Sequence, residues 1–199
     1  MPSEAFMKLS EDKRNKIINA MKKEFGRTEI EKTSVERIIK DAGISKGSFW
    51  VYFENKSEAI DYLTKRYMED EINILKKELI KNKGDIFEAS VNMYVYLIGI
   101  RDAKVLIGNI IQNIITRQDR CFIDCKEKPK NEIEDVFNII DMSNMKFKQR
   151  EYLFTLTKMV IQSIRTNALA VILNKVSEEE ATRNLEREFM ILKEGVLIK

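Results

Sequence analysis

The side chains best suited to binding chemistry lie close together in residues 45–56, which read SKGSFWVYFENK. Lys46 and Lys56 carry ammonium groups, which bind phosphate oxygens. The serine, tryptophan and tyrosine side chains between them can hydrogen-bond to phosphates or to base edges, and Val51 can contact a thymine methyl group. This set of groups is typical of a surface that reads double-stranded DNA.

The elements that must position these groups are two short helices, predicted within residues 33–56. Thr33 and Glu36 form a capping box that starts the first helix. Gly43 ends it, because glycine readily adopts the left-handed conformation of a helix exit. Ser45 can cap the second helix, which runs to Tyr52. A helix, a turn containing glycine and a second helix form the helix-turn-helix motif, whose second helix enters the major groove of DNA.

The aromatic residues of the second helix are expected to divide between the core and the surface. Phe49 and Phe53 are four residues apart and therefore share one helical face, which can anchor the helix to the core. Trp50 and Tyr52 then point elsewhere. The alternative is that all four aromatic side chains belong to the core.

The segment AGISKGSFWVYFENKSEAI resembles the recognition-helix signature of TetR-family transcriptional regulators. The matching residues are Ala42, Gly43, Ser45, Lys46, Gly47, Ser48, Phe49, Tyr52, Phe53, Lys56 and Glu58. Trp50 stands where the family usually has Tyr, Glu29 where it usually has Gly, and Ile39 where the motif prefers Ala. Glu29 affects how the helix before the motif ends, and Ile39 affects how closely the two helices of the motif approach each other.

The resemblance implies a regulator that represses by occupying a near-palindromic operator and leaves it when a small, mostly apolar effector binds. It implies no cofactor. The residues expected to contact DNA are Thr33, Ser34, Ser45, Lys46, Gly47, Ser48, Trp50, Val51, Tyr52 and Lys56.

Composition fits a globular, helical protein that is not an enzyme. The 199 residues are 44% hydrophobic and 34% charged, with a net charge of +3 and no histidine. The lack of histidine excludes His-based acid–base catalysis and His metal ligands. No catalytic residue, metal ligand or Gly-rich phosphate loop is identified. With no signal peptide and no apolar run of about 20 residues, we expect a cytoplasmic protein without a membrane partner.

The rest of the chain carries helical periodicity and no strand alternation. Residues 1–8 are expected to form a loose arm before a first helix that ends near Phe25. Longer helices are predicted over residues 56–82, 85–100, 102–118, 131–142, 147–174 and 177–196, with a loop at 120–130. The predicted fold is all-α, with a three-helix DNA-binding domain (1–55) and a helical ligand-binding and dimerisation domain (56–199). The 56–82 helix is the expected lever between them, and the 85–100 helix is apolar nearly all round.

Helices 147–174 and 177–196 are long and apolar, so one face is expected to remain uncovered in a single chain. Pairing across a two-fold axis would bury it in a homodimer, and glutamate at Ile164 or Leu185 would then give monomers or unfolded chain if these side chains face the partner. The alternative is that both faces are covered within the monomer.

A ligand cavity is expected in the second domain. Its candidate residues are Met93, Tyr94, Tyr96, Met142, Tyr152, Met159 and Arg165. Arg165 is the one charged residue in 159–173, so it is either a partner for an acidic ligand group or a side chain that reaches solvent. The other candidates have ordinary core packing as their alternative.

Two cysteines, Cys121 and Cys125, lie four residues apart. We interpret them as ordinary residues near a loop, with a redox or soft-metal sensor as the alternative. Two other functions stay open for the whole chain: an enzyme built on a helical bundle, and a DNA-binding protein that responds to no ligand. A cavity with convergent polar groups would separate these possibilities.

Overall fold

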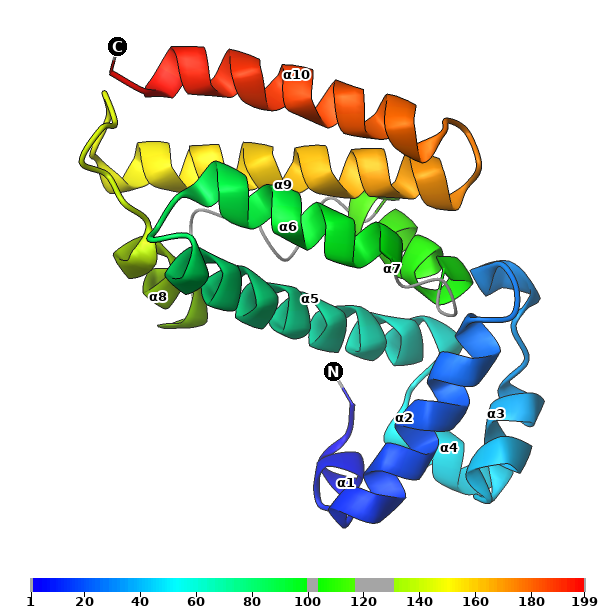
Figure 1. Cartoon of the computed structure of the whole chain (residues 1–199). Helices are drawn as coiled ribbons and strands as arrows, with labels where there is room; N and C mark the ends of the chain where they lie inside the picture. The colour runs from blue at the N-terminus through cyan, green and yellow to red at the C-terminus, as the bar shows by residue number, and fades with distance from the viewer. Residues whose placement is uncertain (1, 100–103, 117–130, 199) are drawn as a thin grey trace. The chain divides into compact units, whose positions relative to one another are not determined.

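A computed structural model of the chain describes residues 2–99, 104–116 and 131–198. Within these ranges the fold is helical, without strands, which confirms the all-α prediction. Figure 1 shows the elements: α1 (Glu4–Met7), α2 (Glu11–Phe25), the 3-10 helix η1 (Ile30–Lys32), α3 (Val35–Ala42), α4 (Lys46–Tyr52), α5 (Lys56–Lys81), α6 (Ile86–Gly99), α7 (Lys104–Thr116), α8 (Asn131–Ile139), α9 (Arg150–Ile172) and α10 (Glu178–Val196). None of the described helices is both long and apolar enough to cross a membrane.

The described residues pack into two compact units. The first, called the head, contains residues 2–68 together with α7. The second, called the body, contains residues 69–99 and 131–198. Because α7 belongs to the head by packing, the head is not one continuous stretch of sequence. The predicted domain boundary after residue 55 stays a prediction.

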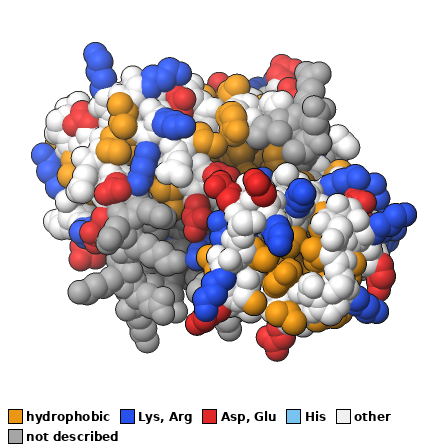
Figure 2. Space-filling view, turned by 90° about the horizontal axis from the view of Figure 1, so that it is seen from below, with side chains coloured by type: hydrophobic (Ala, Val, Ile, Leu, Met, Phe, Trp, Pro, Cys, Tyr) orange, Lys and Arg blue, Asp and Glu red, His pale blue; other side chains and the backbone are white. Residues whose placement is uncertain are grey.

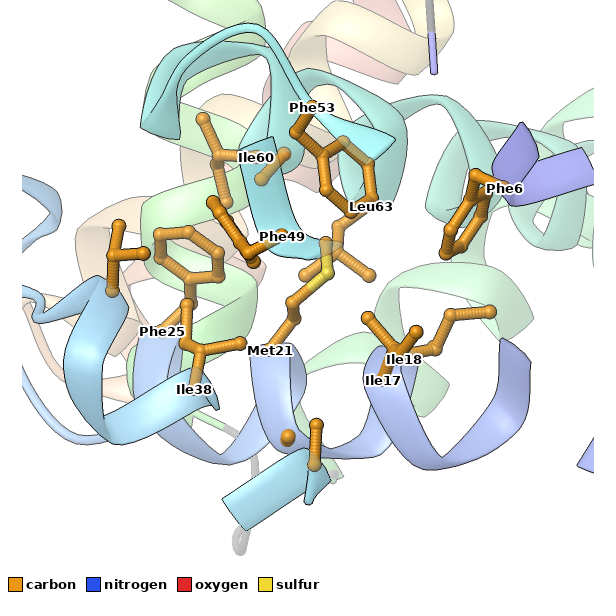
Figure 3. Packing of buried hydrophobic residues seen from close by; sticks show 14 of the residues in the cluster. Phe6, Ile17, Ile18, Met21, Phe25, Ile38, Phe49, Phe53, Ile60 and Leu63 are labelled. Atoms are coloured by element: carbon orange, nitrogen blue, oxygen red, sulfur yellow. The ribbon is translucent and has the colours of Figure 1, made fainter. Parts of the chain in front are cut away.

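The head has a continuous apolar core, drawn in Figure 3. Ile17, Met21 and Phe25 recur every four residues along α2 and are at most 1% exposed. Phe49 and Phe53 meet them with no exposed surface, as the spacing predicted. A four-residue spacing on a helix places side chains on one face, so α2 presents a single apolar stripe to its neighbours.

The start of the chain differs from the expected loose arm. Ser3 caps the short helix α1 by accepting a hydrogen bond from Phe6 N at 3.4 Å. Phe6 is completely buried and belongs to the head core. An aromatic side chain that buries its whole surface contributes roughly 1.5–3 kcal/mol, enough to hold a segment this short in place.

Helix caps are local signals; the cap predicted at Ser45 forms, and Asn55 and Ser177 cap two further helices. Ser45 accepts a hydrogen bond from Ser48 N at 3.0 Å, Asn55 from Glu58 N at 2.9 Å and Ser177 from Glu180 N at 3.1 Å.

The cap predicted at Thr33 is wrong by one residue. Ser34 caps α3 by accepting from Arg37 N. The Thr33 hydroxyl instead donates to Ile30 O at 2.6 Å, the same carbonyl that accepts from Thr33 N at the end of η1.

In the body, α6 and α10 both pack against α9. Ile164 on α9 is fully buried and Leu185 on α10 is 1% exposed, so neither side chain is free to face a partner chain. They fill the interior of their own chain. The α6 helix is also less enclosed than predicted, since Val95 and Tyr96 are more than half exposed.

The end of α5 requires glycine at position 84. Gly84 has φ +86°, which side-chain-bearing residues rarely adopt. A Cβ atom there would lie 2.5 Å from Asp141 N and 2.6 Å from Ile139 O. The predicted loop at 120–130, with Cys121 and Cys125, lies outside the described residues.

Candidate nucleic-acid interface

One face of α4 is exposed to solvent. Trp50 is 43% exposed, Val51 is 58% exposed, and Lys46 and Gly47 are exposed one helical turn before them. Residues four apart on a helix are surface neighbours, so these side chains form one continuous surface. The exposure of Trp50 rules out the alternative in which all four aromatic residues are core residues.

The opposite face of α4 is held rigidly. Phe49 is fully buried, and its ring packs edge-on against Trp50, with centroids 5.1 Å apart and planes at 88°. The indole is therefore held on one side by the core while its other side faces solvent. Edge-to-face packing of this kind favours this orientation of the indole.

The turn between α3 and α4 has the expected geometry. Gly43 lies in the left-handed region at φ +66° and its N–H donates to Lys40 O. A Cβ atom there would meet nothing within 4 Å, so the requirement for glycine comes from the backbone conformation. A cap at Ser45 then starts α4 directly after the turn.

A buried carboxylate joins α2 to α3. Glu24 is 2% exposed and accepts hydrogen bonds from Arg37 Nε at 2.9 Å, from Arg37 Nη2 at 2.7 Å and from Ser34 N at 2.8 Å. Burial by itself raises the pKa of Glu24, but the hydrogen bonds from Arg37 and Ser34 outweigh it and hold the pKa below its ordinary value. This contact orients α3, and through the turn it orients α4.

The α7 helix contributes a second polar contact to the head. Asn109 is 8% exposed, and its amide donates to Phe25 O and to Thr28 O, both at 2.8 Å. The Phe25 carbonyl lies in the last turn of α2, where helices leave carbonyls without intrahelical partners. Asn109 therefore fixes the end of α2, and nothing in the local sequence indicated this.

Two predicted DNA contacts have other roles. Thr33 is 7% exposed and its hydroxyl bonds to the backbone. The Lys56 ammonium donates to the carbonyls of Ile30, Glu31 and Thr33 at 2.9, 3.1 and 3.3 Å. The expectation that Lys56 faces phosphates is corrected, because the three hydrogens of its ammonium are used within the head.

The remaining predicted residues have capping or partly buried positions. Ser34 and Ser45 act as helix caps, and the Ser48 hydroxyl lies 2.8 Å from that of Ser45. Tyr52 is half-buried at the end of α4. The charges nearby are mixed: on the face drawn in Figure 2, Lys and Arg side chains lie among acidic and apolar ones.

The predicted ligand residues differ widely in exposure within the described part of the body. Met93 and Tyr94 are 1% exposed, whereas Tyr96, Tyr152 and Met159 are 48–52% exposed. Met142 is half-buried.

Arg165 is buried, which excludes the alternative of a side chain that reaches solvent. Its guanidinium bonds to both carboxylate oxygens of Glu71, another residue of the body. Both side chains are 4% exposed.

Two surface grooves lie on the body. One of about 450 Å³ runs between α9 and α10 and is lined by residues that include Met159, Thr166, Glu188 and Ile191. A smaller one of about 140 Å³ includes Phe147 and Tyr152, whose rings stack with centroids 4.9 Å apart. The larger groove is open rather than enclosed, and neither groove is lined by Arg165.

Together, α2, the α3–turn–α4 pair and the exposed face of α4 define a helix-turn-helix DNA-binding domain. Residues 17–62 match the family model described as bacterial regulatory proteins, tetR family. This segment of the chain, from α2 to the first turns of α5, is similar to the DNA-binding region of that family. A comparison with curated protein sequences gives no match.

Several solved structures share the fold. A TetR transcriptional regulator from Rhodococcus sp. RHA1 is 16% identical, with a TM-score of 0.59 over 93% of this chain and 98% of that one. A SmeT–triclosan complex is 14% identical, with a TM-score of 0.60 over 95% and 93%. The transcriptional regulator FadR from Bacillus subtilis in complex with stearoyl-CoA is 18% identical, with a TM-score of 0.54 over 87% and 96%.

Proposed function

We propose that this protein is a homodimeric repressor that binds a near-palindromic operator and releases it when a small, mostly apolar effector binds the body. The observation that carries the proposal is the exposed face of α4. Within two helical turns this face presents the ammonium of Lys46, the bare backbone of Gly47, the indole of Trp50 and the branched side chain of Val51.

Each part of that face suits a different part of the duplex. Lys46 has a side chain that is 69% exposed and is 3.9 Å from Glu36, so its ammonium can turn to a phosphate. Gly47 allows the start of the helix to approach the groove closely. Trp50 and Val51 are the groups nearest to base edges in the proposed complex, with Val51 suited to a thymine methyl group.

A second copy of the chain is the proposed partner at α9 and α10. Met159, Met190 and Ile191 are 48%, 61% and 69% exposed on these helices. A partner with the same apolar surface would cover them and the groove of about 450 Å³ beside them. A two-fold dimer would also place two α4 helices on one duplex, as a near-palindromic operator requires.

The proposed effector is a small, mostly apolar molecule, by analogy with solved structures of this fold. Two of the structures with this fold contain stearoyl-CoA and triclosan. In this chain, effector binding would have to favour a body conformation in which the two heads no longer match the operator. The α5 helix contributes residues to both units and is the proposed lever. Because its target is chromosomal DNA, we place the protein in the cytoplasm.

DNA binding is tested by selecting duplexes from a random pool with the unmodified protein and measuring their affinity over a range of salt concentrations. Lys46→Ala should weaken binding to all sequences and lower the salt slope by about one unit. Trp50→Ala should cost about 1–3 kcal/mol for the selected duplex alone. Lys175→Ala, an exposed lysine of the body, is the control. Unchanged binding in both test variants would refute the proposed interface.

Dimer formation is tested with a matched pair of substitutions. Ile191→Glu places a charge on the proposed interface, at a side chain that is 69% exposed. Ile80→Glu makes the same change on α5, at a side chain that is 67% exposed. Light scattering should give a folded monomer for Ile191→Glu and a dimer for Ile80→Glu. A single-chain mass for the unmodified protein at micromolar concentration would refute the proposal.

Screening metabolites for release of the selected duplex tests the effector. If no metabolite releases it, the ligand-independent DNA-binding protein becomes the better reading.

A further inference from the structure

We propose that residues 3–7 brace the recognition helix α4, and that this brace is needed for selective reading of bases. The proposal rests on the proposed DNA-binding function of α4. It assigns a positioning role to Ser3 and Phe6, which precede the helix-turn-helix by about 30 residues in the sequence.

The α4 helix needs outside support because it has only seven residues, Lys46–Tyr52. Isolated helices shorter than about 12 residues are marginal in water. The N-terminal end is capped by Ser45. At the other end the last carbonyls lack partners within the helix and must find them elsewhere.

The brace supplies a partner at that end. The backbone N–H of Ser3 donates to Tyr52 O at 3.0 Å, while Phe53 N donates to Phe49 O at 2.9 Å. The final carbonyl of α4 is therefore bonded to a segment distant in sequence. This bond fixes the last turn of the helix, which carries Val51 one residue earlier.

Side-chain packing reinforces the backbone bond. The Phe6 ring lies 5.8 Å from Tyr52, 5.0 Å from Phe53 and 5.3 Å from Tyr62, measured between centroids. Tyr62 belongs to α5, so Phe6 joins the end of α4 to the beginning of the next long helix. Aromatic contacts at these distances are favourable beyond the area they bury.

The brace is itself anchored. The guanidinium of Arg14, on α2, donates to Met7 O at 3.0 Å. The Ser3 hydroxyl caps α1 at its start. Both ends of α1 are therefore held, and the segment can transmit the position of α2 to α4.

Loss of the brace should affect the two kinds of DNA contact differently. A frayed last turn of α4 would displace Val51 and Trp50 from base edges, whereas Lys46 in the first turn would still reach phosphates. Affinity for a selected sequence should fall while affinity for unrelated DNA stays the same.

A matched pair of variants at one position isolates the backbone bond. Ser3 has φ −63°, which proline adopts without strain. Ser3→Pro removes the hydroxyl and the N–H, whereas Ser3→Ala removes the hydroxyl alone. We expect Ser3→Pro to weaken binding to a duplex selected from a random pool by about threefold to tenfold, and Ser3→Ala by about twofold or less.

Amide hydrogen exchange provides a readout that does not depend on DNA. In Ser3→Pro the amides of α4 and Phe53 should exchange faster, while those of α2 keep their protection. Phe6→Leu should retain most of the selectivity that Phe6→Ala loses, with the exposed Met7→Ala as control.

The proposal is overturned if Ser3→Pro and Ser3→Ala bind the selected duplex equally and protect α4 equally. It is also overturned if binding to selected and unrelated DNA weakens by the same factor. If the unmodified protein binds no duplex, the proposed function fails, and the exchange experiment still decides whether residues 3–7 hold α4.

Discussion

The buried ion pair of the body allows a stringent test of how this fold is stabilised. Arg165 and Glu71 have side chains that are each 4% exposed, and two guanidinium nitrogens of Arg165 donate to the two carboxylate oxygens. Arg165→Met keeps a side chain of similar length but leaves the Glu71 carboxylate buried without this partner.

The expected loss follows from that geometry. Removing one member of a buried pair typically costs about 3–5 kcal/mol, because the remaining charge stays out of water. The unfolding free energy of a typical domain is only about 5–15 kcal/mol, so Arg165→Met should remove a large part of it. Replacing both members by methionine removes both charges and should restore most of the loss.

Urea unfolding of the two single variants and the double variant, followed by circular dichroism, measures the coupling between the residues. Arg183→Met is the control, since Arg183 pairs with Glu179 on the surface of α10. That pair should be worth less than about 1 kcal/mol. The reasoning is refuted if Arg165→Met unfolds within about 1 kcal/mol of the unmodified protein, or if the double variant is as unstable as the single one.

The same variants bear on the predicted ligand role of Arg165. An acidic effector would have to compete with Glu71 for the guanidinium, so binding would leave two carboxylates near one cation. A folded double variant that still releases DNA with an acidic effector would show that Arg165 does not bind it.

Two further outcomes are expected in the head. The lowered pKa of Glu24 means that its contact stabilises the folded head above the ordinary pKa of 4.5 and that this stabilisation is lost as pH falls through the lower folded value. Glu24→Gln should therefore lower stability at neutral pH, and the difference should shrink below pH 4.5. Lys56→Met should reduce the unfolding free energy by about 1–3 kcal/mol, because three carbonyls lose a shared donor. The salt slope of DNA affinity should stay unchanged. A slope lower by about one unit would instead show that Lys56 contacts a phosphate, as the sequence suggested.

Local sequence signals were sufficient for the motif that carries the proposed function. Gly43 ends α3, Ser45 starts α4, and Phe49 and Phe53 share one buried face. Each of these features depends on residues within about five positions, through backbone conformation, capping and helical period. The same signals located the long helices and the all-α class, because they are repeated in every turn of helix.

The contacts that position α4 depend on the tertiary structure. Ser3 meets Tyr52, Asn109 meets Phe25, and Glu24 meets Arg37 across separations that no helical period encodes. For the same reason, periodicity identified Ile164 and Leu185 as apolar but not which apolar surface would cover them. Sequence alone was enough to locate the longer helices and to identify the buried face of α4, whereas it missed α1 and the exposed side of α6. The packing of one helix on another decided which polar groups bond within the chain, as Lys56 and Arg165 do, and which remain exposed to meet a partner. The reason is that burial depends on neighbours that only the folded chain brings together.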